Sequence, residues 1–170
     1  VLWSTLRVRA DGTVTGCRLT RGWAPGRELC FAIRYSQPMR SRELYDREQD
    51  VAYKGFKGPG HQPVDADYSQ GRALVGVFDF GQLKRPLLAK VAISPVSEDN
   101  AIANLDRDGA GWDFDARRAE AKAAWDQALA AIDVDAPAPV RTSFYTSLYH
   151  AMLSPTLATD VNGEYRGPDH

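Results

Sequence analysis

The chain has 170 residues, of which 44% are hydrophobic and 25% are charged, an ordinary composition for a soluble globular protein. Its formal net charge is −1, with 21 basic and 22 acidic residues, so it has no overall basic field that would hold a nucleic-acid backbone. No apolar run approaches the roughly 20 residues that a membrane-spanning helix needs. We therefore expect neither a membrane span nor a nucleic-acid partner.

Both ends of the chain have the character of cuts inside a longer protein. The chain begins Val1-Leu2-Trp3, without an initiator Met or a signal segment, and it stops in the turn-like sequence Gly167-Pro168-Asp169-His170. We expect it to be an internal segment.

The first third of the chain predicts antiparallel β structure. Residues 4–9 alternate apolar and polar side chains, Asp11-Gly12 is a strong tight-turn signal, and residues 13–20 continue the period of two. A third strand is predicted from about residue 29 to residue 35, after a break that contains Gly and Pro. Three strands joined by short turns indicate a meander.

The two cysteines, Cys17 and Cys30, lack the Cys-x-x-Cys spacing of a metal site. A hairpin centred between Trp23 and Ala24 would place them directly opposite each other. Both a disulfide and a pair of free buried thiols are compatible with this arrangement, since cysteine is often simply a small core residue.

Residues 37–71 show no sustained period and are rich in Gly, Pro, Asp, Gln and Lys. The segment exceeds the roughly 12 to 15 residues of an ordinary structureless connection, so we interpret it as a loop that is either functional or poorly ordered. Strand-like composition returns at residues 73–80 and 87–94. At least five strands therefore precede residue 95, enough for part of a sandwich.

From Ser97 onward the hydrophobic period changes to that of a helix. Ser97 is expected to cap a short helix that ends at Asp108-Gly109, Asp113 or Asp115 to cap a second helix, and Pro139 to lie in the first turn of a third. Two apolar stripes are expected to be buried: Ala121, Trp125, Ala128, Leu129 and Ile132 in the second helix, and Val140, Phe144, Leu148, Ala151 and Met152 in the third. Sheet is thus followed by helices.

Common catalytic and nucleotide-binding motifs are absent from the sequence. It contains no GxxxxGK loop, no GxGxxG and no Gly-x-Ser-x-Gly elbow. The three histidines, His61, His150 and His170, lack the spacing of a helical zinc pair and are interpreted as structural. Capping and helix-dipole interactions explain the acids at helix ends, which are Asp106, Asp108, Asp113 and Asp115. We assign no catalytic residue and no metal ligand within the chain.

Several short strings stand in order along the chain. They are Gly22-Trp23, Tyr35-Ser36-x-Pro38, Ala92-Ile93-Ser94, Val96-Ser97, Ala101-x-x-Asn104-Leu105, Gly111-Trp112-Asp113-Phe114-Asp115, Trp125-x-x-x-Leu129 and Phe144-Tyr145-Thr146-Ser147-Leu148-Tyr149-His150. The tail, residues 159–169, contains Asp160-Val161-Asn162-Gly163-Glu164-Tyr165-Arg166-Gly167-Pro168-Asp169. These strings resemble glycoside hydrolase family 92, whose Asp-x-x-Gly-x-Tyr-x-Gly-x-Asp turn the tail matches. No motif is recognised between residues 39 and 71.

The resemblance implies an α+β fold in three parts. Residues 1–95 would be the later portion of an antiparallel β-sandwich, residues 96–137 a helical linker, and residues 138–170 the start of an (α/α)6 catalytic barrel, with its first helix. It further implies an exo-acting, calcium-dependent, inverting α-mannosidase that removes terminal α-linked mannose from glycans, with α-1,2 linkages favoured. The family's acid, base and most calcium ligands lie beyond His170, so the segment alone is expected to be inactive. A secreted or periplasmic bacterial protein is implied.

By the same resemblance, Asp169 would hydrogen-bond the hydroxyls of the terminal mannose, with Arg166 and Tyr165 close to it. A salt bridge that stabilises the turn is the competing interpretation of these charged residues. For the whole chain, the alternative is a non-catalytic β-sandwich module that binds carbohydrate or protein through exposed aromatics, namely Trp3, Trp23, Tyr45 and Tyr53. Because the apolar faces lack partners, we also expect the isolated segment to self-associate.

Overall fold

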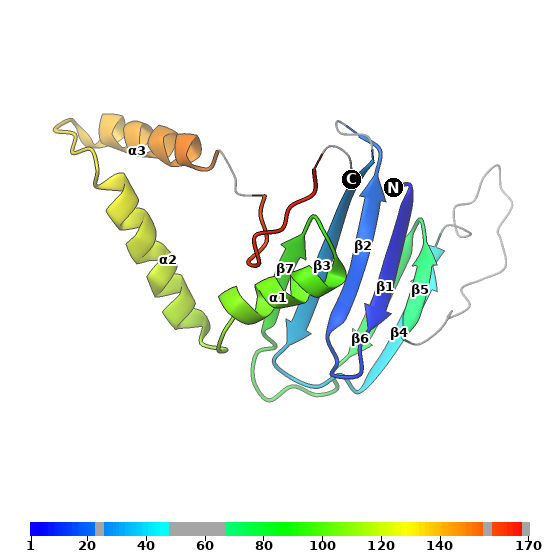
Figure 1. Ribbon diagram of the computed structural model, residues 1–170. Helices are drawn as coiled ribbons and strands as arrows, with labels where there is room; N and C mark the ends of the chain where they lie inside the picture. The colour runs from blue at the N-terminus through cyan, green and yellow to red at the C-terminus, as the bar shows by residue number, and fades with distance from the viewer. Residues whose placement is uncertain (23–25, 48–66, 155–157, 168–170) are drawn as a thin grey trace, which may run out of the picture. The chain divides into compact units, whose positions relative to one another are not determined.

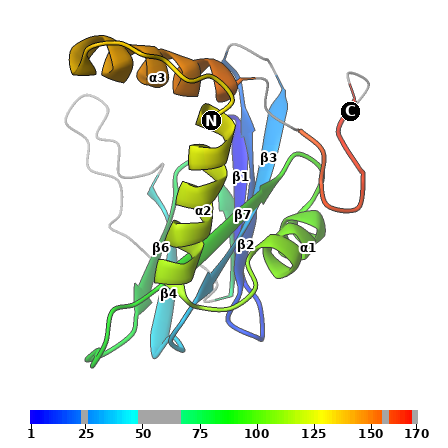
Figure 2. The ribbon, with the colours of Figure 1, turned by 90° about the vertical axis from the view of Figure 1, so that its left-hand side faces the viewer.

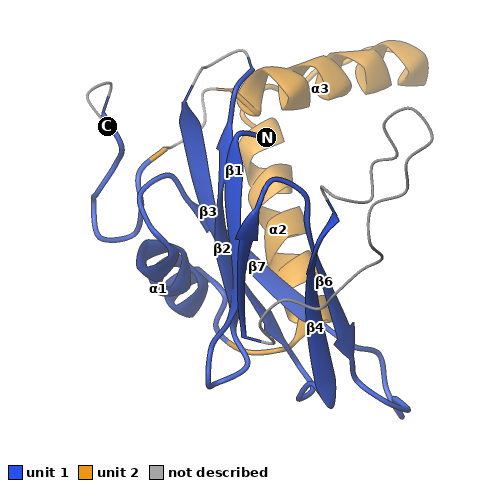
Figure 3. Ribbon diagram, turned by 90° about the vertical axis from the view of Figure 1, so that its right-hand side faces the viewer, with its two compact units in different colours: residues 1–110, 159–170 blue, residues 111–158 orange. Residues whose placement is uncertain are grey.

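The computed structural model describes residues 1–22, 26–47, 67–154 and 158–167. The chain forms two compact units, one of residues 1–110 with 159–170 and one of residues 111–158 (Figure 3). The first unit holds the strands β1–β7 and helix α1, and the second holds helices α2 and α3. The units do not follow the boundaries that the family resemblance implies, and those boundaries stay a prediction.

Two antiparallel sheets build the first unit (Figure 1). The five-stranded sheet has the order β5-β1-β2-β3-β7, and the two-stranded sheet consists of β4 and β6. The strands are β1 (Trp3–Val8), β2 (Val14–Thr20), β3 (Arg27–Tyr35), β4 (Ser41–Asp46), β5 (Tyr68–Gly71), β6 (Leu74–Asp79) and β7 (Ala89–Ser94). The predicted meander is confirmed as β1-β2-β3, and the strands predicted at 73–80 and 87–94 are confirmed as β6 and β7.

The first hairpin follows its local sequence signals. Val8 pairs with Val14, and Gly12 adopts a φ of 81° in the turn between them, a conformation that glycine enters at little cost. The Asp11 carboxylate accepts a hydrogen bond from the backbone N–H of Thr13 at 2.9 Å. This bond, together with the Thr13 hydroxyl and the nearby Arg34, outweighs desolvation and lowers the pKa of Asp11.

The second hairpin brings the two cysteines together. Cys17 and Cys30 are direct partners in the β2–β3 register and form a disulfide. The backbone N–H of Cys17 bonds the hydroxyl of Thr5 in β1, so it points away from β3. The cysteines therefore occupy a non-hydrogen-bonded pair, where cross-strand side chains lie closest. Of the two alternatives that the sequence leaves open, the structure has the disulfide.

The interpretation of residues 37–71 as one long loop is wrong for the part that the structure describes. β4 and β5 both lie inside this segment, and residues 48–66 fall outside the described residues. β4 buries one apolar side chain, that of Leu44, and β5 buries Ser69 and Gly71. Strands with so few buried apolar positions lack the alternation by which a half-buried strand is recognised.

Other elements pack against both faces of the five-stranded sheet. One core cluster lies toward the two-stranded sheet and contains the buried residues Val8, Val14 and Leu44. A second cluster joins Ala32 of β3 to Ala101 and Leu105 of α1 (Glu98–Asp108). Figures 1 and 2 show α1 on one face of this sheet and β4 with β6 on the other.

Helix α1 has the predicted bounds. The Ser97 hydroxyl accepts a hydrogen bond from the backbone N–H of Asn100 at 3.0 Å, and Gly109 is the C-cap. Glu98, in the first turn, accepts hydrogen bonds from Thr15 at 2.6 Å and Thr5 at 3.4 Å. These bonds join the start of α1 to β1 and β2.

The second unit contains α2 (Phe114–Leu129) and α3 (Ala138–Met152). Asp113 caps α2, with Oδ1 2.9 Å from the backbone nitrogen of Ala116, and Pro139 lies in the first turn of α3, both as predicted. The predicted burial of the two apolar stripes is wrong for this chain, because neither helix has a buried residue. An amphipathic helix buries its stripe only where other elements cover it.

None of the helices among the described residues is long and apolar enough to cross a membrane.

Candidate functional site

The tail folds as a tight turn in the first unit. The Asp160 carbonyl accepts a hydrogen bond from Gly163 N–H at 2.9 Å, and Asp160 N–H donates to the Glu164 carbonyl at 2.8 Å. Gly163 has a φ of 87°, which favours glycine. The turn chemistry that the sequence shows at Asn162-Gly163 thus produces a closed loop, described to residue 167.

The side chain of Asp160 is enclosed by neutral donors. It is 6% exposed. Its Oδ2 accepts from the Ser94 hydroxyl at 2.6 Å and from Asn100 Nδ2 at 2.9 Å, and its Oδ1 accepts from Asn104 Nδ2 at 2.7 Å. Asn104 also accepts a bond from the backbone N–H of Val161 at 2.9 Å. These bonds attach the tail to β7 and α1.

The environment of Asp160 favours its charged form. Burial by itself would raise the pKa, but the hydrogen bonds from Ser94, Asn104 and Asn100 outweigh it and hold the pKa of Asp160 below its ordinary value of 3.8. The carboxylate is therefore ionised at neutral pH and acts only as an acceptor toward its three donors.

Arg166 provides the second attachment of the tail. Nε donates to the Pro95 carbonyl at 2.6 Å and Nη2 to the Val96 carbonyl at 3.0 Å, while Nη1 lies 2.7 Å from a carboxylate oxygen of Glu28. All three guanidinium nitrogens are thus engaged with the first unit. This ion pair joins the tail to β3. A salt bridge between Arg166 and Asp169 within the turn stays a prediction, because Asp169 falls outside the described residues, and so does binding of substrate by Arg166.

Of the other two predicted site residues, Tyr165 and Asp169, the structure describes only Tyr165. Tyr165 is 68% exposed, between two attached residues of the tail. Asp169 lies outside the described residues. The structure therefore brings Arg166 and Tyr165 into one anchored loop, and the contact of either with substrate remains a prediction.

Sequence reasoning missed the residues that hold the tail. Asn100 and Asn104 stand four residues apart in α1, so they share a helix face. Asparagine has low helix propensity, and two on one face were a signal that their side chains bond something outside the helix. Their partner lies 56 to 60 residues away in the sequence, which no local pattern indicates.

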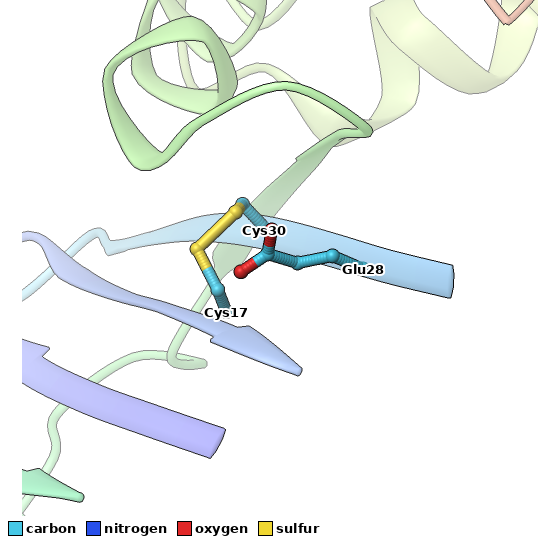
Figure 4. A group of neighbouring side chains, drawn as sticks. All are labelled: Cys17, Glu28 and Cys30. Atoms are coloured by element: carbon cyan, nitrogen blue, oxygen red, sulfur yellow. A yellow bond between two sulfur atoms is a disulfide. The ribbon is translucent and has the colours of Figure 1, made fainter. Parts of the chain in front are cut away.

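One group of side chains has the spacing of metal ligands. One ligand atom each from Cys17, Glu28 and Cys30 lies within 4.8 Å of the others (Figure 4). Both sulfurs are joined in the disulfide, so they are not thiolates, and calcium prefers six to eight oxygen ligands. This group does not fit the calcium that the family resemblance implies.

The alternative binding module has no assembled platform among the described residues. Trp3, which is 44% exposed, belongs to the five-stranded sheet, whereas the half-buried Tyr45 belongs to the two-stranded sheet. Trp23 and Tyr53 fall outside the described residues.

Comparison of the sequence with known families finds the model "Glycosyl hydrolase family 92 catalytic domain" over residues 100–170. The match takes in most of α1, both helices of the second unit and the tail. A curated protein of Arthroderma benhamiae, described as an uncharacterized secreted glycosidase, is 31% identical over 81 residues, which are 45% of this chain and 10% of that protein.

Solved structures match nearly the whole chain. An α-mannosidase of family GH92 from Bacteroides thetaiotaomicron superposes with a TM-score of 0.83 at 29% identity, over 99% of this chain and 22% of that one. The same enzyme has also been solved in complex with mannoimidazole. A GH92 family glycosyl hydrolase, ccman5, has a TM-score of 0.78 at 26% identity, over 97% of this chain and 21% of the other. The chain thus spans about a fifth of the length of these relatives.

Proposed function

Because this chain belongs to glycoside hydrolase family 92, we propose that it is part of an enzyme that removes terminal α-linked mannose from glycans. The observation that carries the proposal is the likeness to an α-mannosidase over 99% of the chain at 29% identity. This likeness includes the tail, which is the segment that we propose to lie beside the substrate.

We propose an inverting mechanism with α-1,2 linkages as the favoured substrate. Inversion needs one carboxylic acid to protonate the leaving oxygen and one carboxylate to activate water on the opposite face, roughly 6.5 to 9.5 Å apart. Asp160 is the only buried acid among the described residues, and its oxygens are occupied by three protein donors. Asp160 is thus unsuited to either role, and, following the family resemblance, we propose that the acid and the base lie in other parts of a longer protein.

The contribution of this chain is proposed to be one edge of the mannose-binding subsite. Asp169 would accept hydrogen bonds from sugar hydroxyls, and the exposed ring of Tyr165 would offer an apolar face with a polar tip. Arg166 would act mainly through the loop that it holds, since its three nitrogens already have partners.

We further propose a bound calcium ion and a secreted or periplasmic location. Calcium would help bind and distort the terminal mannose through oxygen ligands outside this segment. The disulfide supports an oxidising compartment, in keeping with the relative described as secreted.

The function is tested with the full-length protein on α-1,2-mannobiose. We expect release of mannose with the β configuration at the first turnover, followed by NMR, and loss of activity with a calcium chelator. Release of the α anomer would overturn the inverting mechanism, and absence of mannose release from α-1,2-mannobiose would overturn the α-1,2 preference. Absence of mannose release from 4-nitrophenyl α-mannoside as well would overturn the function itself. The 170-residue segment, assayed in parallel, is expected to show no turnover.

The role of the tail is tested by substitution in the same protein. Asp169→Asn is expected to lower kcat/KM roughly tenfold to a hundredfold, the range for a lost hydrogen bond to a charged group. Tyr165→Ala should lower it less, and Tyr165→Phe, which keeps the ring, less again. Unchanged kinetics in both Asp169→Asn and Tyr165→Ala would remove the tail from the substrate site.

A further inference from the structure

The tail is attached at two points that flank its exposed aromatic residue. Asp160 lies five residues before Tyr165 and Arg166 directly after it, and both turn their side chains into the first unit. We propose that Asp160 and Arg166 are positioning residues that fix Tyr165 and the backbone around it at the edge of the sugar subsite. This inference rests on the function proposed above, which places the tail beside substrate.

The Asp160 attachment depends on the chemistry of a carboxylate. Three donors converge on its two oxygens, from Ser94 of β7 and from Asn100 and Asn104 of α1. An Asn at this position has nearly the same shape, but one of its two terminal atoms is a donor that would face a donor. Only a side chain whose terminal atoms all accept hydrogen bonds, such as an ionised Asp, can satisfy these three donors. The turn itself does not require such a side chain, because its backbone hydrogen bonds would form without it.

Further hydrogen bonds from α1 to the turn reinforce this attachment. Asn104 holds Val161 through its side-chain oxygen, and Nη1 of Arg107 donates to the Val161 carbonyl at 2.7 Å. Asn100 also donates to the exposed carboxylate of Glu164 at 2.8 Å. Side chains on one face of α1 thus bond Asp160, Val161 and Glu164 of the turn.

The Arg166 attachment depends on the shape of a guanidinium. Its fork bonds two consecutive carbonyls, those of Pro95 and Val96, between β7 and α1, and it reaches Glu28 in β3. A lysine carries the same charge but cannot present donors in this planar arrangement. Glu28 lies two residues before Cys30 on the same strand face, so the bridge rests beside the disulfide.

The two attachments leave one aromatic side chain free to meet a ligand while its backbone is held. Tyr165 is 68% exposed, whereas Arg166 has 23% of its side chain exposed and Asp160 is buried. A loop ordered before binding spares the entropy of ordering it on the ligand. Loss of either attachment should therefore weaken binding of substrate more than it slows the chemical step.

The test uses the full-length enzyme with 4-nitrophenyl α-mannoside. Asp160→Asn and Arg166→Lys are compared with Glu164→Gln, which removes a charge from the same loop but keeps an oxygen to accept from Asn100. We expect the first two variants to raise KM roughly tenfold, the lower end for residues that act through another group, with a smaller change in kcat. Glu164→Gln should keep KM within about twofold of the wild-type value. Hydrogen exchange of residues 159–167 should quicken in the first two variants only.

The outcomes separate this inference from the proposed function. If the wild type releases mannose but Asp160→Asn keeps normal KM and normal exchange, the positioning role is overturned and the function stands. If exchange quickens while KM does not change, the residues hold the loop but do not position it for substrate, which also overturns the inference. If the wild type has no mannosidase activity, the proposed function fails, and the positioning role fails with it. A loss of kcat at unchanged KM would contradict the predicted effect on binding.

Discussion

The two compact units of the chain have equally clear local signals but very different burial. Helix α1 of the first unit and helix α2 of the second both begin at a side-chain cap, Ser97 and Asp113. Yet α1 buries Ala101 and Leu105, whereas α2 and α3 bury no residue. Capping and periodicity determine where a helix begins and which stripe is apolar, but only neighbouring elements can bury that stripe.

The second unit therefore carries exposed apolar side chains that the first unit largely avoids on α1. Phe114 is 64% exposed, Ile132 47% and Val140 55%. Exposed apolar side chains in a group favour association, so self-association of the isolated segment stays a prediction, which sedimentation velocity would check. Substitutions in each unit test this difference in burial more sharply.

The largest effect is expected in the core of the first unit. Leu44 is fully buried between the two sheets, beside Val8 and Val14. Leu44→Ala should lower the free energy of unfolding by about 2 to 5 kcal/mol, through lost burial and the cavity left behind. Urea denaturation followed by tryptophan fluorescence would measure this change.

Val140→Ala is the matched substitution in the second unit. Because Val140 is 55% exposed, the change should stay within about 0.5 kcal/mol in the 170-residue segment. A similar cost for both variants would show that the second unit is covered as well as the first, and the contrast between them would fail.

The disulfide should give the next largest effect, again confined to the first unit. It closes a separation of 13 residues in the β2–β3 hairpin. The double variant Cys17→Ala/Cys30→Ala should lose about 3 kcal/mol of unfolding free energy, since the unfolded chain is no longer restrained by the cross-link. The same variant compared with wild type in dithiothreitol should show a much smaller difference. Equal differences in both conditions would mean that packing, not the cross-link, is responsible.

The sequence predicts the parts of the fold whose signals are local. The Asp11-Gly12 turn and the alternation on either side of it predict the first hairpin. A second hairpin centred between Trp23 and Ala24 predicts that Cys17 faces Cys30. β4 and β5 could not be predicted in this way, because Leu44 is the sole buried side chain of β4 and β5 buries Ser69 and Gly71. Their strand character comes from pairing with distant strands.

The sequence likewise predicts only those parts of the candidate site that have local signals. The turn at Asn162-Gly163 is local, so the sequence indicates a loop there, and the family resemblance directs attention to Tyr165 and Arg166. The bonds that fix this loop join Asp160 to residues 56 to 66 positions earlier. Such pairs arise from the packing of α1 on the sheet, which the sequence does not display.

A smaller and pH-dependent effect is expected at Asp160. Asp160→Asn should cost about 2 kcal/mol at neutral pH, because hydrogen bonds to a buried charge are lost and donors are left unsatisfied. The pKa of Asp160 is lowered in the folded state, so its stabilisation is complete above the unfolded value of about 3.8. The stabilisation is lost as the pH falls through the lower, folded pKa.

Urea denaturation of the wild type and of Asp160→Asn between pH 7 and pH 3 measures this dependence. The difference between the two proteins should be constant from pH 7 to about pH 5 and should shrink below pH 4. A difference that grows as the pH falls would mean that the pKa of Asp160 is raised in the folded state, opposite to the direction inferred from its three donors.

The smallest effects are expected at the N-caps of α1 and α2. Both caps use the same kind of hydrogen bond, but α1 is packed on the sheet and α2 has no buried residue. The Ser97 hydroxyl bonds Asn100 N–H at 3.0 Å, and the Asp113 carboxylate bonds Ala116 N–H at 2.9 Å. Loss of either cap costs about 1 kcal/mol.

In Ser97→Ala this cost should lower the unfolding midpoint of the first unit, since α1 is packed on the sheet. In Asp113→Ala it should reduce helical circular dichroism at low temperature and leave that midpoint unchanged, because α2 buries nothing that would couple its fraying to the core. If Asp113→Ala shifts the midpoint as much as Ser97→Ala does, the two units unfold as one, and burial within each unit does not decide its stability.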